Sequence, residues 1–124
     1  MLLDSNIIIY SVQPENSRLR QFIAEREPAV SALSYLEVLG YHQLTDDARL
    51  YFNQFFDATR IIPISQPVIE RAVTLRQQRR MSVGDAIIAG TALQYNMTLV
   101  TRNTEDFQWI TELQLLNPFE GDMT

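Results

Sequence analysis

Residues 1–11, MLLDSNIIIYS, combine a short apolar strand at positions 1–3, an acidic residue at Asp4 and a short helix from Asn6 to Ser11. A strand followed at once by a helix is the repeating unit of a parallel sheet that helices cover. Further apolar runs predict strands at residues 28–30, 61–64, 98–101 and 113–116. The run at 61–64 contains Pro63, which cannot donate a ladder hydrogen bond, so we expect that strand at a sheet edge.

Helical periodicity fills the intervals between these strands. The predicted helices span residues 17–26, 34–44, a segment that starts at 45–47, and residues 67–80, 83–94 and 104–110. Such alternation predicts an α/β fold with a mostly parallel central sheet covered on both faces. The sequence has no repeat, low-complexity stretch or linker, and therefore indicates one domain over residues 1–124.

The composition excludes several kinds of chemistry. The chain has 124 residues, 46% of them hydrophobic, which is typical of a globular domain with its own core. It has no cysteine, and therefore neither a thiol nucleophile nor a thiolate zinc site. The single histidine, His42, rules out a two-histidine ribonuclease mechanism, and we expect it to be a partly buried structural residue in a helix.

The net charge is −5, and every basic side chain is an arginine. This balance argues against indiscriminate binding of nucleic acid over a basic surface, although metal ions can still join an acidic protein to a polyanion. The N-terminal residues carry no basic stretch followed by a long apolar run, and the apolar runs are too short to cross a bilayer. We therefore expect a cytoplasmic protein with no membrane partner.

Acidic and amide side chains fall where strands end or helices begin. Asp4 ends the first strand, Glu37 and Asp85 open predicted helices, and Asn103 and Asp106 follow the strand at 98–101. Helix capping is one explanation for three of them. The pairs Ser34–Glu37, Ser82–Asp85 and Asn103–Asp106 all have the spacing of a capping box.

Capping explains Asp4 less easily, because this residue lies between an apolar strand and the apolar run Ile7-Ile8-Ile9. A buried carboxylate is costly unless it is paired, hydrogen-bonded or bound to a metal. In a parallel sheet the strand ends and the following helix starts share one edge, where ligands bind, so these acids should meet there. Carboxylates that meet repel one another unless a cation neutralises them, and oxygen ligands favour Mg²⁺, with Mn²⁺ as an alternative.

Four motifs, taken in order, resemble those of PIN-domain nucleases, and the VapC type of toxin is the closest subgroup. They are Leu3-Asp4-Ser5-Asn6, Ser31-x-x-Ser34-x-x-Glu37, Asp85-Ala86-x-Ile88-Ala89-x-Thr91-Ala92 and Thr101-x-Asn103-x-x-Asp106-Phe107. No single motif is decisive, but four in order over residues 1–107 are specific. The resemblance implies a three-layer α/β/α sandwich and metal-dependent cleavage of single-stranded or structured RNA.

The resemblance also assigns roles to individual residues. It carries Asp4, Glu37 and Asp85 over as acidic residues of the metal site. It implies that three further residues position these acids or the scissile phosphate: Ser5, Asn6 and Thr101.

One position departs from the family pattern, because Asn103 stands where many relatives have a fourth aspartate. Asp106 is then expected to take the fourth acidic role, or the site binds a second metal weakly. We expect Asp4 and Asp85 to hold Mg²⁺ directly and Glu37 and Asp106 to bind it through water. Either Glu37 or Asp106 would orient the attacking water.

The expected partners are an RNA substrate, a cognate antitoxin and a second copy of the chain. Arg102 follows the last motif strand and is the better candidate for an RNA contact, whereas Arg76, Arg79 and Arg80 form either a solvated helix end or a phosphate contact. The aromatic-rich segment with Tyr51, Phe52, Phe55 and Phe56 either packs in the core or helps to form a groove for an antitoxin segment or a second subunit.

Two other functions compete with the nuclease. Asn103 favours a non-catalytic PIN-like module that binds RNA or a protein. A phosphotransferase on a receiver-like α/β fold would require a lysine near the last strands, and the chain has no lysine.

Overall fold

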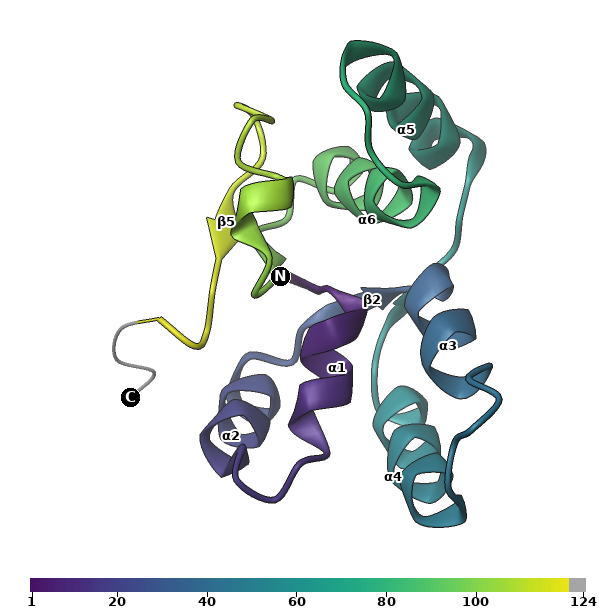
Figure 1. Ribbon diagram of the computed structural model, residues 1–124, viewed down its shortest axis with the longest axis vertical. Helices are drawn as coiled ribbons and strands as arrows, with labels where there is room; N and C mark the ends of the chain where they lie inside the picture. The colour runs from purple at the N-terminus through teal and green to yellow at the C-terminus, as the bar shows by residue number, and fades with distance from the viewer. Residues whose placement is uncertain (121–124) are drawn as a thin grey trace.

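The computed structural model describes residues 1–120, which surround a five-stranded sheet with the order β3-β2-β1-β4-β5 (Figure 1). All four strand pairs are parallel, as the sequence predicts. The strand with Pro63 directly after it, β3, lies at the edge, which confirms that prediction too. The strands are β1 (Leu2–Leu3), β2 (Ala29–Ser31), β3 (Ile61–Ile62), β4 (Leu99–Val100) and β5 (Leu115–Leu116).

Helices cover both faces of this sheet. They are α1 (Ser5–Ser11), α2 (Ser17–Arg26), α3 (Ala32–Leu39), α4 (Asp46–Asp57), α5 (Gln66–Gln78) and α6 (Val83–Gln94). Figure 1 shows α5 and α6 above the sheet and α1 to α4 below it. The predicted α/β/α sandwich is therefore confirmed. Among residues 1–120, no helix has the length and apolarity that crossing a membrane requires.

Four of the five strands, all but β3, supply side chains to two separate cores. Leu2 packs with Ile88 and Ala92 of α6, whereas its neighbour Leu3 packs with the helices on the opposite face. Leu99 and Val100 divide between the two cores in the same way. Successive side chains of a strand point to opposite faces, so even two-residue strands made only of large apolar residues tie the layers together.

The order of strands reverses beside β1. The chain proceeds outward from β1 to β2 and β3, and then returns to place β4 on the other side of β1. In open α/β sheets, such a switch point opens a crevice at the carboxyl ends of the strands. Asp4 directly follows β1 and Thr101 directly follows β4, so both lie at the mouth of this crevice.

Several predicted boundaries were wrong. Helix α3 begins at Ala32 rather than residue 34, because the Ser31 hydroxyl accepts from the Leu33 N–H at 3.0 Å, and it ends before Gly40 rather than at 44. His42 therefore lies in an exposed turn beside the Tyr41 ring, not partly buried in a helix. The predicted helix at 104–110 is only a short 3-10 turn, η1 (Thr104–Asp106).

Candidate functional site

Asp4 is fixed from two directions at the end of β1. Its Oδ1 accepts from the backbone N–H of Ser5 at 2.8 Å, which caps α1, and its Oδ2 accepts from the Thr101 hydroxyl at 2.8 Å. The side chain is 8% exposed. Asp4 therefore does cap α1, but capping does not explain the second bond. That bond, from Thr101, joins residues 97 positions apart and ties the carboxylate to the end of β4.

Glu37 is held by serine hydroxyls rather than by a capping box. The Ser5 hydroxyl donates to Glu37 Oε1 at 2.8 Å, and Ser5 Oγ lies 2.8 Å from Ser34 Oγ. Because Ser5 has one hydroxyl hydrogen and gives it to Glu37, Ser34 must be the donor in the second bond. The predicted Ser34–Glu37 box is wrong, since Ser31 caps α3 and Glu37 stands beyond the first turn.

Asp85 stands in the first turn of α6. The Ser82 hydroxyl accepts from the Asp85 N–H at 3.0 Å, which confirms the predicted cap. A Cβ atom built on Gly84 would lie 3.8 Å from Glu37 Oε2, so the start of α6 faces the Glu37 carboxylate closely. The Asp85 side chain is half-buried at this junction.

Asn103 and Asp106 lie in the segment after β4. The Asn103 N–H donates to Thr101 Oγ1 at 3.1 Å, and its carbonyl accepts from the Asp106 N–H at 3.1 Å. The Asn103 side chain forms no cap, so the predicted capping role of this pair is wrong. The Asp106 carboxylate is exposed to solvent.

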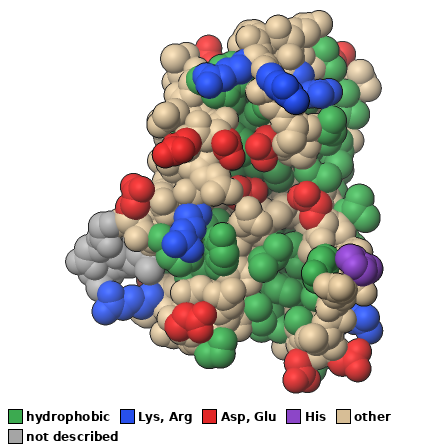
Figure 2. Space-filling model, viewed as in Figure 1, with side chains coloured by type: hydrophobic (Ala, Val, Ile, Leu, Met, Phe, Trp, Pro, Cys, Tyr) green, Lys and Arg blue, Asp and Glu red, His purple; other side chains and the backbone are tan. Residues whose placement is uncertain are grey.

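The four carboxylates form one electrostatic group. Burial raises the pKa of Asp4, against the lowering effect of the bonds from Thr101 and Ser5, and the negative charges of Glu37 and Asp106 raise it further. Burial also raises the pKa of Asp85, followed by the charges of Asp4 and Asp106, and Glu37 adds to the rise. Figure 2 shows acidic side chains across the middle of this face, with basic side chains above and below them.

No arginine neutralises this group within residues 1–120, where the ion pairs are Arg26–Glu25 and Arg49–Asp46. The possible metal ligands are all carboxylate and hydroxyl oxygens, and carboxylate oxygens are the ligands that Mg²⁺ and Mn²⁺ prefer. The chemistry therefore fits a divalent metal. The carboxylates are spaced too widely to form a closed coordination shell around a metal, because in residues 1–120 no three acidic or histidine side chains converge around one point.

The predicted supporting residues separate into two groups. Ser5 and Thr101 are buried and contact the acids directly, whereas Asn6 is exposed in the first turn of α1. Arg102 is exposed and lies against the rings of Tyr10 and Phe119.

Two arginines at the end of α5 make local contacts. Arg76 donates to the carbonyl of Met81 at 3.2 Å, and Arg79 lies over the Trp109 ring. These contacts favour the helix-end interpretation of that cluster.

The sequence motifs contained Ser34 without giving it a role in the site. It is fully buried and links Ser5 to α3 through its hydroxyl. The available signal was the three-residue spacing of Ser31, Ser34 and Glu37, which places successive polar groups along one side of a helix that is otherwise apolar.

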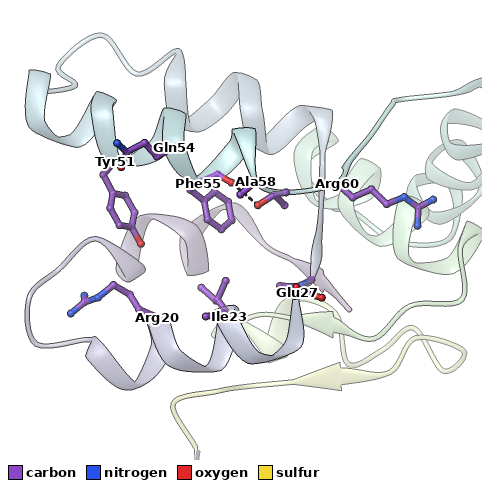
Figure 3. A pocket seen from close by; sticks show the side chains of 11 residues that line it. Arg20, Ile23, Glu27, Tyr51, Gln54, Phe55, Ala58 and Arg60 are labelled. Atoms are coloured by element: carbon purple, nitrogen blue, oxygen red, sulfur yellow. Dashed lines mark hydrogen bonds between the residues drawn. The ribbon is translucent and has the colours of Figure 1, made fainter.

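A separate hollow of about 660 Å³ lies between α2 and α4, away from the acidic group. Figure 3 shows Tyr51 and Phe55 of α4 facing Arg20 and Ile23 of α2 across it. Phe52 and Phe56, by contrast, are buried in the core. Both alternatives for the aromatic segment therefore apply in part: Phe52 and Phe56 pack in the core, whereas Tyr51 and Phe55 line a hollow whose other wall is α2.

The chain is similar to known proteins over nearly its whole length. The profile of the PIN-domain family matches residues 1–112. A chain in a toxin–antitoxin complex from Klebsiella pneumoniae is 31% identical, with 97% of this chain and 98% of that chain covered and a TM-score of 0.75. No curated protein sequence matches.

More distant solved structures share the fold. FitAcB from Neisseria gonorrhoeae is 22% identical, with 97% and 99% of the two chains covered and a TM-score of 0.78. VapBC2 from Rickettsia felis, bound to a DNA fragment from its promoter, is 23% identical, with 94% and 96% covered and a TM-score of 0.81. At this level of identity the likeness concerns the fold alone.

Proposed function

The chain belongs to the PIN-domain family, and we propose that it is a Mg²⁺-dependent endoribonuclease that serves as the toxin of a toxin–antitoxin pair. The observation that carries the proposal is the buried Asp4 carboxylate, fixed by Ser5 and Thr101 within the field of three other carboxylates. Folding brings these like charges together at a cost, which a bound divalent cation would offset.

In this proposal Asp4 and Asp85 bind Mg²⁺ directly, Glu37 and Asp106 bind it through water, and Mn²⁺ is an alternative ion. When bound, the cation would supply positive charge to the scissile phosphate and acidity to a water molecule. Glu37 is the better of the two residues proposed to orient the attacking water. Ser5 fixes its Oε1, which leaves Oε2 free to accept a proton beside α6.

The proposed antitoxin would place an apolar segment in the groove between α2 and α4. The walls offer Ile23, Tyr51 and Phe55 for apolar side chains, and Arg20 and Arg60 would attract acidic residues of the segment. A mostly apolar groove with charged ends is typical of sites that bind an amphipathic segment of another protein. The relative from Klebsiella pneumoniae was solved in a toxin–antitoxin complex, which supports such a partner.

The proposal is tested by cleavage of a labelled RNA pool with purified protein, in Mg²⁺ and in EDTA, for wild type and Asp4→Asn. We expect metal-dependent cutting by the wild type and a loss of at least about 100-fold in the variant, because even indirect disruption of a metal site costs 10- to 100-fold. Asp57→Asn is the matched control, since Asp57 is an exposed acid at the far end of α4.

Two results would contradict the nuclease. Equal cutting by wild type and Asp4→Asn would remove Asp4 from the site. Intact RNA with a folded, uninhibited wild type would favour the alternative, a non-catalytic PIN-like module that binds RNA or a protein.

A further inference from the structure

Three segments that are distant in the sequence meet at Arg102. Its guanidinium carbon lies 4.5 Å from the centre of the Phe119 ring and 5.3 Å from that of Tyr10. The two rings lie 5.6 Å apart and nearly perpendicular, at 84°. Tyr10 belongs to the end of α1 and Phe119 to the segment after β5, so the arginine occupies a corner that these two aromatic rings form.

Local hydrogen bonds fold the C-terminal segment back onto the arginine. The Thr101 N–H donates to the Leu116 carbonyl at 3.0 Å, which extends the pairing of β4 with β5. Asn117 Oδ1 then accepts from the Phe119 N–H at 2.9 Å and turns the chain. Asn117 Nδ2 donates to the Arg102 carbonyl at 3.5 Å, and Pro118 is buried.

The position of Arg102 relative to the acids is informative. It is the residue after Thr101, whose hydroxyl holds Asp4, yet no carboxylate of residues 1–120 forms an ion pair with it. Its N–H donors are therefore available to an external anion, and its contact with Tyr10 places the guanidinium at the opposite end of α1 from Asp4, about 9 Å along the helix. The rings cover part of its apolar surface, limit its rotamers and leave its outer edge exposed.

We propose that the corner of Tyr10 and Phe119 holds Arg102 ready to bind a phosphate of the RNA substrate other than the scissile one, at the end of α1 remote from Asp4. This inference rests on the proposed nuclease function and adds two positioning residues and the segment 117–119 to its site. A chain with a net charge of −5 repels RNA at long range, so a cation at the Tyr10 end of α1 helps to fix where the backbone of the RNA approaches.

The test measures RNA binding separately from cutting. Fluorescence anisotropy of a labelled single-stranded RNA in Ca²⁺, at several salt concentrations, gives both the affinity and its salt dependence. We expect Arg102→Ala to weaken binding about tenfold and to reduce the slope of log K against log salt by about 0.7, the contribution of one phosphate contact on a single strand.

The other variants separate charge from positioning. Arg102→Lys and Phe119→Leu keep the positive charge and should keep the slope, while losing affinity by about 2- to 5-fold because the guanidinium fork or its support is gone. Arg71→Ala is the matched control, since Arg71 is an exposed arginine bonded to Gln94 at the opposite end of α6 from Asp85. It should change neither quantity.

In Mg²⁺, steady-state cleavage by Arg102→Ala should show a raised KM with little change in kcat. If Arg102→Ala matches Arg71→Ala in affinity and slope, the phosphate subsite is wrong even where the wild type cuts RNA. If binding depends on Arg102 but neither the wild type nor any variant cuts RNA, the nuclease proposal fails while the phosphate subsite at Arg102 is supported. A wild type that neither binds nor cuts RNA overturns both.

Discussion

The burial of Asp4 makes the folded protein sensitive to pH. Its carboxylate gains two hydrogen bonds but loses water and faces other acids, and the net effect is a pKa above the ordinary value of 3.8. A folded state with a raised carboxyl pKa binds a proton more readily than the unfolded chain does. Its contribution to stability is therefore complete at low pH and is lost as the pH rises from 3.8 through the raised value.

We therefore expect the metal-free protein in EDTA to gain stability as the pH falls from 7 toward 3.8, and Asp4→Asn to gain less. At pH 7, Mg²⁺ at about 100 times its Kd should stabilise the wild type by about 2.7 kcal/mol, because an ion that binds only the folded state shifts the unfolding equilibrium. Thermal unfolding with and without Mg²⁺ measures both effects.

Asp57→Asn should behave as the wild type in both measurements. An identical pH response in Asp4→Asn would mean that the Asp4 carboxyl does not titrate in this range. A Mg²⁺ effect of equal size in Asp4→Asn would mean that the ion binds elsewhere.

At the level of single residues, local spacing alone predicted contacts at a helix start, whereas only the family resemblance indicated Ser5 and Thr101, whose contacts join distant segments. Ser82 and Asp85 lie three positions apart at a helix start, so a local rule predicted their bond correctly. The same rule failed for Glu37, because Ser31 offered an earlier cap and Ser5, 32 positions away, supplied the partner. No local spacing rule relates two residues that lie 32 positions apart, as Ser5 and Glu37 do.

At the level of elements, α5 and α6 pack closely enough to make a glycine necessary. A Cβ atom on Gly90 would lie 3.0 Å from the Val68 carbonyl oxygen and 3.2 Å from the Ala72 nitrogen, both backbone atoms that move only with the helix. On Gly84, at the start of the same helix, it would meet only ordinary contacts, at 3.7 Å to Leu33 and 3.8 Å to Glu37.

We expect the two alanine substitutions to have opposite signs. Gly84→Ala should stabilise the protein by up to about 1 kcal/mol, the difference in helix propensity. Gly90→Ala should destabilise it, because overpacking costs about 1–3 kcal/mol and exceeds that gain. Denaturant unfolding of both variants provides the measurement, and stabilisation by Gly90→Ala would show that α5 lies further from α6.

The elements themselves were predicted well where apolar residues decide them. The strands at β1 and β4 and the helices α2 and α6 follow from burial on both sheet faces and from helical spacing. The segment after β4 was overpredicted as a helix. The helical turn ends after η1, because Phe107 and Ile110 turn into the core beneath β4 and β5. Core packing, and not helix propensity, decides the conformation of this segment.

At the level of the whole molecule, apolar side chains remain exposed on helices of both sheet faces and just after the edge strand β3. Leu36 of α3 is 66% exposed and Val73 of α5 is 50% exposed, and these helices cover opposite faces of the sheet. Ile64, after β3, is also exposed. An apolar surface beside a free sheet edge is typical of an interface, and we propose that a second copy of the chain covers it.

Light scattering should therefore give twice the chain mass of 14.3 kDa for the wild type. Leu36→Glu should give the single-chain mass, because a charge without a partner would be buried at the centre of the contact. Leu50→Glu is the matched control, since Leu50 is 61% exposed on α4, away from β3. A dimer that survives Leu36→Glu would have its interface elsewhere, and a wild type of single mass at every concentration would contradict the homodimer. Because the acids come from the end of β1 and from α3, α6 and η1 of one chain, a Leu36→Glu protein of single-chain mass should still cut RNA.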